Sequence, residues 1–171
     1  MLRLGMENKS VITAHRNKTS RFDDLSENLE AIYRVQPKAV LVATILVGTA
    51  PRVLNVPDRI LPFYKSNFND EIRPRLSTGD QTLWAEFPAA VSENQAGDAL
   101  KTVAQFRQLP TRGPADTHRQ AYDYVAVVPV YVDNVNPPRV DRNNNLGIDI
   151  DADYENMLDI MCKAYHARWH L

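Results

Sequence analysis

The sequence predicts an α/β or α+β fold, a single domain in which a small mixed sheet is flanked by three or more helices. Two apolar segments, residues 39–47 and 122–134, are rich in the β-branched side chains that favour strands. Around them lie segments whose apolar residues recur at the 3.6-residue period of helices. A chain of 171 residues fits one domain. We therefore expect residues 20–171 to form a globular domain, preceded by a flexible, polar arm at residues 1–19.

The first half of the chain contains one expected helix and one expected buried strand. Residues 20–35 place apolar side chains on one helical face, with Ser20 as the N-cap. The segment AVLVATILV at residues 39–47 is apolar throughout, which is typical of a strand covered on both faces. In the proline-rich segment that follows, we expect short helical turns at 59–64 and 69–75.

Two shorter elements are expected before the central strand. Residues 81–87, QTLWAEF, alternate between apolar and polar side chains, and this alternation predicts a short strand. Residues 99–109 have a helical period in which Leu100, Val103 and Ala104 face the core.

The longest β-branched run, YDYVAVVPVYVDN at residues 122–134, predicts the central strand of the sheet. Pro129 lacks an N–H group and indicates a break or bulge within it. A last helix is expected to begin near Asp151 or Asp153 and to end near Trp169. Its apolar side chains form a stripe at helical spacing: Tyr154, Met157, Leu158, Met161, Tyr165 and Trp169.

The composition narrows the class of protein. The formal net charge is −1, so bulk charge gives no attraction for nucleic acid. A single cysteine, Cys162, excludes an internal disulfide framework and favours a reducing, cytoplasmic setting. No apolar run approaches the ~20 residues of a membrane-spanning helix. The sequence therefore predicts a soluble cytoplasmic protein that does not enter a membrane.

A polar loop before the last helix is a candidate site for a divalent cation. Its sequence DRNNNLGIDIDAD resembles the start of a calcium-binding EF-hand loop, in which oxygen ligands recur at alternate positions. Gly147 comes one residue later than in that pattern, and Ala152 takes the place of the closing glutamate. A polar loop that caps the helix explains the same residues, so both interpretations stay open. The candidate ligands are Asp141, Asn143, Asn145 and Asp149.

Three carboxylates near the predicted strands are candidates for catalysis. Metal-dependent nucleases and hydrolases bring acidic groups together at the ends of strands, and Asp123, Asp133 and Glu86 are available for this role. The Glu-x-Lys pattern common in restriction nucleases is absent from both nearby strands. The carboxylates still leave a metal-dependent nuclease or hydrolase, with a role in defence as one option, as an alternative function.

Two further candidate sites depend on side-chain type and spacing. Cys162 and His166 lie four residues apart on the expected last helix, where two zinc ligands can share one face. A buried cysteine and a histidine near a helix end explain them equally well. The region 52–75 mixes basic and aromatic residues, a pattern that binds single-stranded nucleic acid in some proteins. Its candidate residues are Arg52, Arg59, Lys65, Arg73 and Arg75.

The strands and helices leave part of the sheet without cover. Only three helices are clear, although fully apolar strands need cover on both faces. We therefore expect the proline-rich segment or another subunit to cover one face, which favours a homo-oligomer or a complex with a protein partner. The leading hypothesis is a non-catalytic assembly or interaction subunit of a bacterial or viral complex. A nucleic-acid-binding module is the second alternative.

Overall fold

The fold begins with a βαβ unit. In the computed structural model, β1 (Leu4–Val11) leads through α1 (Lys18–Val35) to β2 (Val40–Gly48), and the two strands pair in parallel. Residues 39–47 are almost entirely apolar, and β2 is correspondingly buried along most of its length. The structure describes residues 2–13, 15–55, 68–87 and 90–169.

The main sheet has the strand order β1-β2-β5-β6. Strand β5 (Tyr124–Tyr131) pairs in parallel with β2, and the short β6 (Arg139–Val140) pairs antiparallel with β5. Pro129 lies within β5 and interrupts neither pairing register, although it cannot donate a ladder hydrogen bond. The sheet is therefore mixed, and the protein is a small α+β domain, as the sequence predicts.

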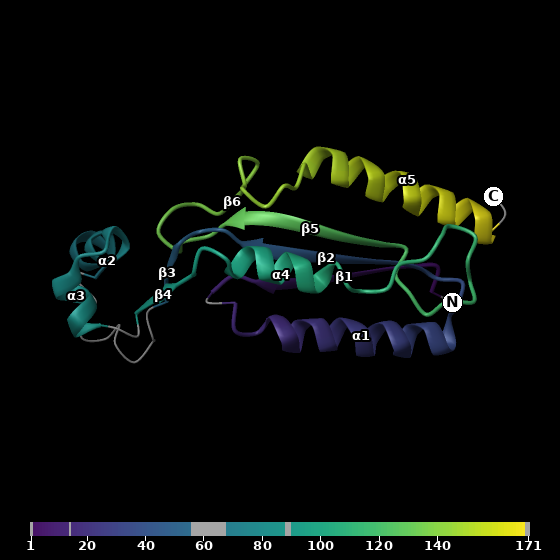
Figure 1. The fold of residues 1–171 in the computed structure, drawn as a ribbon, viewed down its shortest axis with the longest axis horizontal. Helices are drawn as coiled ribbons and strands as arrows, with labels where there is room; N and C mark the ends of the chain where they lie inside the picture. Colours follow the sequence, from purple (N-terminus) through teal and green to yellow (C-terminus); the bar gives the residue numbers. More distant parts are fainter. Residues whose placement is uncertain (1, 14, 56–67, 88–89, 170–171) are drawn as a thin grey trace.

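A small second unit is inserted between β2 and the later helices. Strand β3 (Arg52–Leu54) pairs antiparallel with β4 (Val91–Glu93), and between them lie the π-helical η2 (Phe68–Ile72), α2 (Arg73–Thr78) and α3 (Gln81–Glu86). In Figure 1, α2 and α3 lie at one end of the molecule, away from α1 and α5. The unit has an apolar core of its own, formed by Leu54, Phe68, Leu76, Leu83 and Ala90.

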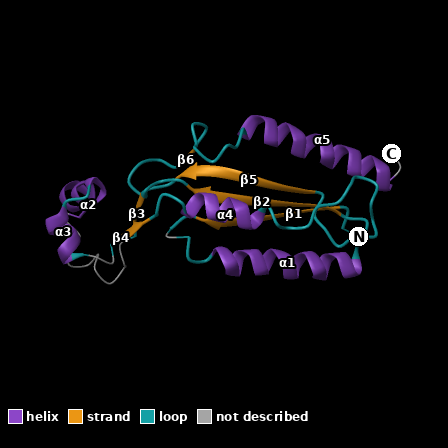
Figure 2. Ribbon diagram, viewed as in Figure 1, coloured by secondary structure: helices purple, strands orange, loops and turns teal. Residues whose placement is uncertain are grey.

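Two more helices complete the layers around the sheet. Helix α4 (Asp98–Phe106) packs with α1, and α5 (Ile150–Trp169) lies on the other side of the strands. Figures 1 and 2 show α5 along one side of the sheet and α1 along the opposite side. No helix in the described ranges is both long enough and apolar enough to cross a membrane.

Two sequence-based predictions differ from the structure, and a third cannot be compared with it. Residues 4–11 lie in the segment expected to be a flexible arm, but they form β1, because pairing with the apolar β2 outweighs their polar composition. Residues 81–86 form α3 and not a strand, since the side chain of Asp80 caps the N–H groups of Thr82 and Leu83. The turns expected at 59–64 lie outside the described residues.

The inward face of α4 also differs from the prediction. Val103 is buried as expected, but Leu100 and Ala104 are exposed, and the other buried side chains are Thr102 and Phe106. Helix α4 is therefore rotated about its axis by about one residue relative to the predicted orientation. This rotation brings the ring of Phe106 onto the sheet.

Candidate functional site

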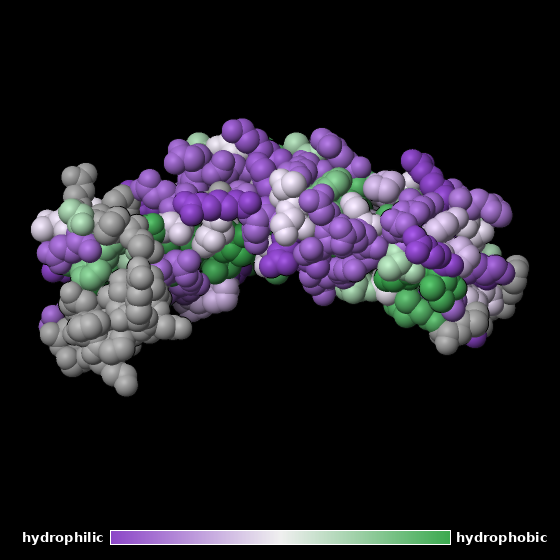
Figure 3. All heavy atoms as spheres, turned by 90° about the horizontal axis from the view of Figure 1, so that it is seen from below, coloured by the Kyte–Doolittle hydropathy of each residue, from purple (hydrophilic) through white to green (hydrophobic). Residues whose placement is uncertain are grey.

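Two helices, α1 and α4, cover most of one face of the sheet. On this side, which we call the closed face, Phe22 of α1 and Phe106 of α4 have ring centroids 6.1 Å apart. The inward side chains of α1, Leu25 and Leu29, are buried against the strands. Seen from the α1 side, the middle of the molecule presents mainly hydrophilic residues (Figure 3). The closed face is therefore a packed core under a mainly polar exterior, with the exposed apolar residues Val35 and Leu100 on its helices.

The opposite side, which we call the open face, is covered only in part. Helix α5 packs mainly on β5, while β1 lies two strands away at the edge of the sheet. Glu7 of β1 points to the closed face, where it accepts a hydrogen bond from Asn28 of α1. Leu4 and Met6 alternate with it and therefore point to the open face, where they are 45% and 50% exposed. Parallel strands normally carry cover on both faces.

A groove of about 700 Å³ follows the uncovered part of this face. We call it the α5 groove. Its floor includes Met6 of β1 and Thr44 of β2, and its wall includes Tyr154, Leu158 and Met161 of α5. The lining is mostly apolar, so the groove suits an apolar surface and not a hydrophilic substrate.

The apolar stripe of α5 is wider than its contact with the sheet. Met157 is buried against Val42 and Ala126, which are side chains of β2 and β5. Tyr154 and Leu158 belong to the same stripe but are 57% and 41% exposed. The sequence predicted an apolar stripe at helical spacing, and the structure shows that only part of this stripe packs on the sheet. The other part forms the wall of the α5 groove.

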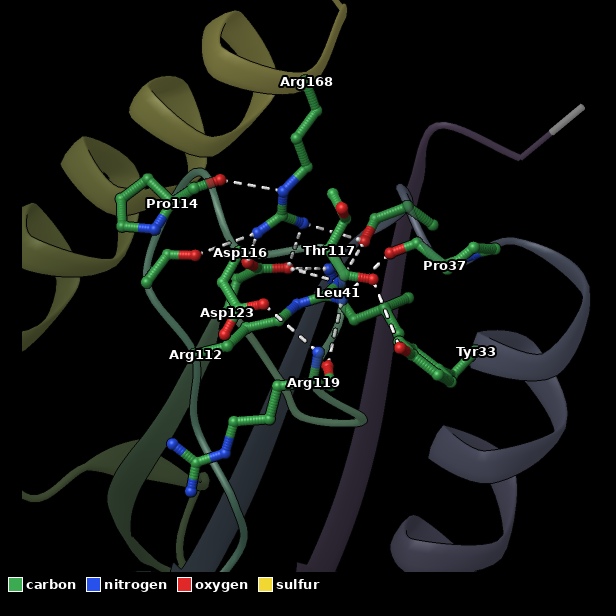
Figure 4. A network of polar contacts seen from close by, with 12 residues as sticks. Tyr33, Pro37, Leu41, Arg112, Pro114, Asp116, Thr117, Arg119, Asp123 and Arg168 are labelled. Carbon is green, nitrogen blue, oxygen red and sulfur yellow. Dashed lines mark hydrogen bonds and ion pairs between the residues drawn. The ribbon is translucent and has the colours of Figure 1, made fainter.

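A buried cluster of charges fixes the carboxyl end of α5. Asp123 lies just before β5, and its carboxylate accepts hydrogen bonds from the Leu41 N–H (2.8 Å), from Arg112 (3.3 Å) and from Arg168 (Figure 4). The three charged side chains are at most 1% exposed. Because Asp123 is enclosed by two arginines and a backbone amide, it is placed to hold the fold together, away from solvent and substrate.

The second positive charge of this cluster is offset by backbone carbonyl groups. Both guanidinium groups donate to the carbonyl oxygen of Ala39, which precedes β2, and to carbonyl oxygens of nearby loops, including those of Pro37 and Pro114. Since Arg168 belongs to the last turn of α5, the cluster holds that end of the helix against the start of the strands. It therefore positions the wall of the α5 groove.

The amino end of α5 is fixed by different contacts. The side chain of Asp149 accepts a hydrogen bond from the Ala152 N–H (3.1 Å) and caps the helix. The Tyr124 hydroxyl donates to Asp153, and burial together with this carboxylate raises the pKa of Tyr124. Arg142 pairs with the neighbouring carboxylate Asp151 and lowers its pKa. This end of the groove is thus rich in carboxylates.

The predicted cation loop is held by its own side chains. Asn144, which the sequence did not single out, donates to the carbonyl oxygens of Asp141 and Ile148, and it accepts from the Leu146 N–H. The carboxylate of Asp141 accepts a hydrogen bond of 2.6 Å from Thr49. These contacts are those of a polar loop that leads into α5. The two remaining candidates in the loop, Asn143 and Asn145, are exposed.

The predicted metal ligands lie in the loop before α5 and on α5 itself. Within the part of the chain that the structure describes, no three His, Cys, Asp or Glu side chains are placed to hold one ion. Cys162 and His166 are both exposed on α5, with the surface ion pair Asp159–Lys163 between them in sequence. Binding of a divalent cation or of zinc therefore stays a prediction.

The predicted catalytic carboxylates lie far apart. Asp123 and Asp133 flank opposite ends of β5, roughly 30 Å apart along an extended chain. Asp133 organises the loop after β5, because it accepts hydrogen bonds from the N–H groups of Val135 and Asn136. Burial raises its pKa, but these hydrogen bonds outweigh that effect and lower it. Glu86 is exposed at the end of α3, in the inserted unit.

The predicted basic region is partly neutralised by acidic partners. Arg52 lies 3.8 Å from Glu93 across the β3–β4 pair, and Arg75 lies 2.8 Å from Asp80. Arg73 follows η2 in the same inserted unit. The other two candidates, at positions 59 and 65, lie outside the described residues. Nucleic-acid binding by this region stays a prediction.

His15 is a buried polar group that sequence reasoning left unassigned. Its two ring nitrogens lie 2.7 Å from the Thr102 hydroxyl and 3.1 Å from the Gly48 carbonyl oxygen. Burial lowers the pKa of His15, so the neutral ring is favoured, and its Nε2–H donates to the Gly48 carbonyl oxygen, which can only accept. The residue joins the carboxyl end of β1 to β2 and α4.

The exposed apolar residues of β1, Leu4 and Met6, were also missed. Leu2, Leu4 and Met6 alternate with other residues, and this period of two could have signalled a strand with one apolar face. The signal is weak because it covers only three positions and ends at Asn8.

The comparisons with known proteins give no family for this chain. No family model matches the sequence, and no curated protein and no solved structure is similar to it.

Proposed function

We propose that this chain is an assembly or interaction subunit that binds a protein partner through the open face. The observation that supports the proposal is the gathering of four exposed, large apolar side chains around one groove. Met6 contributes from β1, Val140 from β6, and Tyr154 and Leu158 from α5. Contiguous apolar surface of this kind marks interaction sites, since isolated exposed apolar residues are common but lined grooves are not.

The hydrophobic effect gives the proposal its energetic basis. Full burial of a side chain such as leucine or methionine contributes about 1.5–3 kcal/mol relative to exposure. Helix α5 cannot move over β1 to supply this burial, because both of its ends are fixed by hydrogen bonds and ion pairs. A second molecule can supply it, and the sheet then obtains the cover that parallel strands require.

The test compares variants of the open face with matched variants of the closed side. Met6→Asp/Leu158→Asp places two charges in the α5 groove. Val35→Asp/Leu100→Asp places the same charges on exposed apolar residues of α1 and α4. Light scattering measures self-association of each protein, and affinity capture from the source cells measures retained partners.

We expect the wild type and the control variant to associate with the same partner, either a second copy or another protein. The groove variant should lose at least nine-tenths of this association while keeping its thermal stability. A wild type that stays monomeric and retains no protein would contradict the proposal. Equal association by the groove variant would contradict it too.

A further inference from the structure

We infer that the α5 groove receives an amphipathic helix of the partner, seated over β1 alongside α5, with basic residues at the end that meets the amino terminus of α5. This inference rests on the proposed function and specifies the chemistry of the partner. It depends on three features of the described residues: the spacing between β1 and α5, the change in character along the groove, and the charge at its ends.

The spacing leaves room for one helix. Strands in a sheet are about 4.8 Å apart, so β1 lies roughly 10 Å from β5, the strand on which α5 packs. Packed helices have axes about 8–10 Å apart, so a helix over β1 would contact both β1 and α5 at ordinary distances. The closed face already holds two helices, α1 and α4, over the same strands. The open face therefore has one helix position that no described segment fills.

The length of the position is also set by the structure. Strand β1 has eight residues, which span ~27 Å, and a helix of ~18 residues has the same length. The wall residues Tyr154, Leu158 and Met161 are three or four positions apart on α5. Such a row of side chains packs against a helix with the same periodicity.

The groove changes from apolar to polar along its length. Strands β1 and β5 are both parallel to β2, and α5 runs back over β5, so the carboxyl end of α5 lies near Leu4. At the other end the groove is lined by Asn8 of β1 and by the carboxylates Asp151 and Asp153 of α5. A partner helix that matches this gradient has its apolar stripe over Leu4 and Met6, and a polar end over Asn8.

The charges at the two ends have opposite signs. Asp149, Asp151 and Asp153 lie at the amino end of α5, and Arg142 is the basic residue that lines the groove there. At the carboxyl end of α5, Arg3 lies over the Trp169 ring, 5.2 Å from its centroid, and donates to the Tyr165 hydroxyl. Lysine or arginine side chains on the partner therefore complement the carboxylate end. Helices carry basic residues most favourably in their last turn. The carboxyl end of the partner helix therefore meets the amino end of α5, and the two helices are antiparallel.

The experiment selects binders from a display library of 18-residue peptides that are randomised at every position. Selection is run on the wild-type protein, on Met6→Asp/Leu158→Asp and on Val35→Asp/Leu100→Asp. The aligned sequences show the period of the apolar positions and the distribution of charge. Enriched peptides are then synthesised, and their affinities for the three proteins are measured by fluorescence anisotropy.

We expect apolar residues at helical spacing, with lysine and arginine at least threefold more frequent than acidic residues near the carboxyl end of the peptide. The peptides should bind the groove variant at least tenfold more weakly than the wild type and should bind the control variant as well as the wild type. Asp151→Asn should weaken binding about threefold, while Asp159→Asn, on the exposed pair with Lys163, should leave it unchanged.

Apolar residues at alternate positions would overturn the inference, because they would indicate a strand that adds to the free edge of β1. Peptides that bind the groove variant equally well would overturn it as well, as would a selection without enrichment. If open-face variants abolish partner capture but no helical peptide is enriched, the helix inference fails and the proposed function stands. If the groove variant changes neither partner capture nor peptide binding, the proposed function and the helix inference both fail.

Discussion

The two faces of the same sheet show how differently one set of strands can be used. The closed face is covered by α1 and α4, and its side chains form the main core. Among the described segments, α5 alone packs on the open face, and four large apolar side chains around the α5 groove stay exposed. Composition does not explain the difference, because the positions of β2 are apolar on both faces apart from Thr44 and Gly48. The two faces differ in how many of the described helices cover them.

The largest effect should come from breaking the contact that holds α5 in place. Asp123→Asn leaves Arg112 and Arg168 buried without a counter-charge, and removal of one partner from such a cluster costs about 3–5 kcal/mol. Chemical denaturation measures the loss in the free energy of unfolding. The matched variant Asp159→Asn removes an exposed ion pair and should cost less than about 1 kcal/mol. Equal effects of the two variants would show that the cluster does not anchor α5.

A pair of leucines on helices that flank opposite faces sharpens the comparison. Leu25 of α1 is fully buried in the closed face, so Leu25→Ala should lower the free energy of unfolding by about 3–5 kcal/mol. Leu158 of α5 lines the open groove, so Leu158→Ala should change it by about 0.5 kcal/mol or less. Denaturant titration of both variants at equal concentration is the measurement. A large loss for Leu158→Ala would mean that the groove is closed in solution.

The effect of pH on the free energy of unfolding should be smaller than these effects. It should come from His15, which lies near the carboxyl ends of the strands. Burial lowers the pKa of His15 in the folded protein, so the unfolded chain binds a proton more readily. The stability contributed by the neutral ring is then complete above a pH of about 6.5 and is lost as the pH falls toward the lowered pKa. Thermal unfolding at pH 5 to 8 should therefore show a shallower pH dependence for His15→Gln than for the wild type. If the two proteins show the same dependence of thermal stability on pH, His15 does not have this role.

The main sheet and its helices could be predicted because their signals are local. Strand β2, helix α1, strand β5 and helix α5 all lie close to the ranges expected from periodicity and β-branched content. Strand β1 was missed because its stability comes from pairing with β2, which is distant in the sequence. The strand expected at 81–87 was wrong because a single capping residue, Asp80, decides in favour of a helix.

The candidate site could be predicted only in outline. The expectation that the proline-rich segment or another subunit covers one face follows from counting helices, and it stays a prediction. The position of the groove could not be predicted, because the exposure of Leu158 depends on which strand α5 covers. The role of Asp123 was hidden for a similar reason, since its partners Arg112 and Arg168 lie 11 and 45 residues away.

The most direct test of the open face as a binding surface is the reactivity of a cysteine placed in it. In a Cys162→Ser background, Met6→Cys reports on the α5 groove, and Val35→Cys reports on an exposed apolar position of α1. Maleimide labelling rates are measured for the purified proteins and inside the source cells. We predict that the cysteine at position 6 reacts at least tenfold more slowly in cells than in the purified protein, while the cysteine at position 35 reacts at similar rates. Equal rates at position 6 in both settings would mean that no partner covers the groove, and would contradict the account.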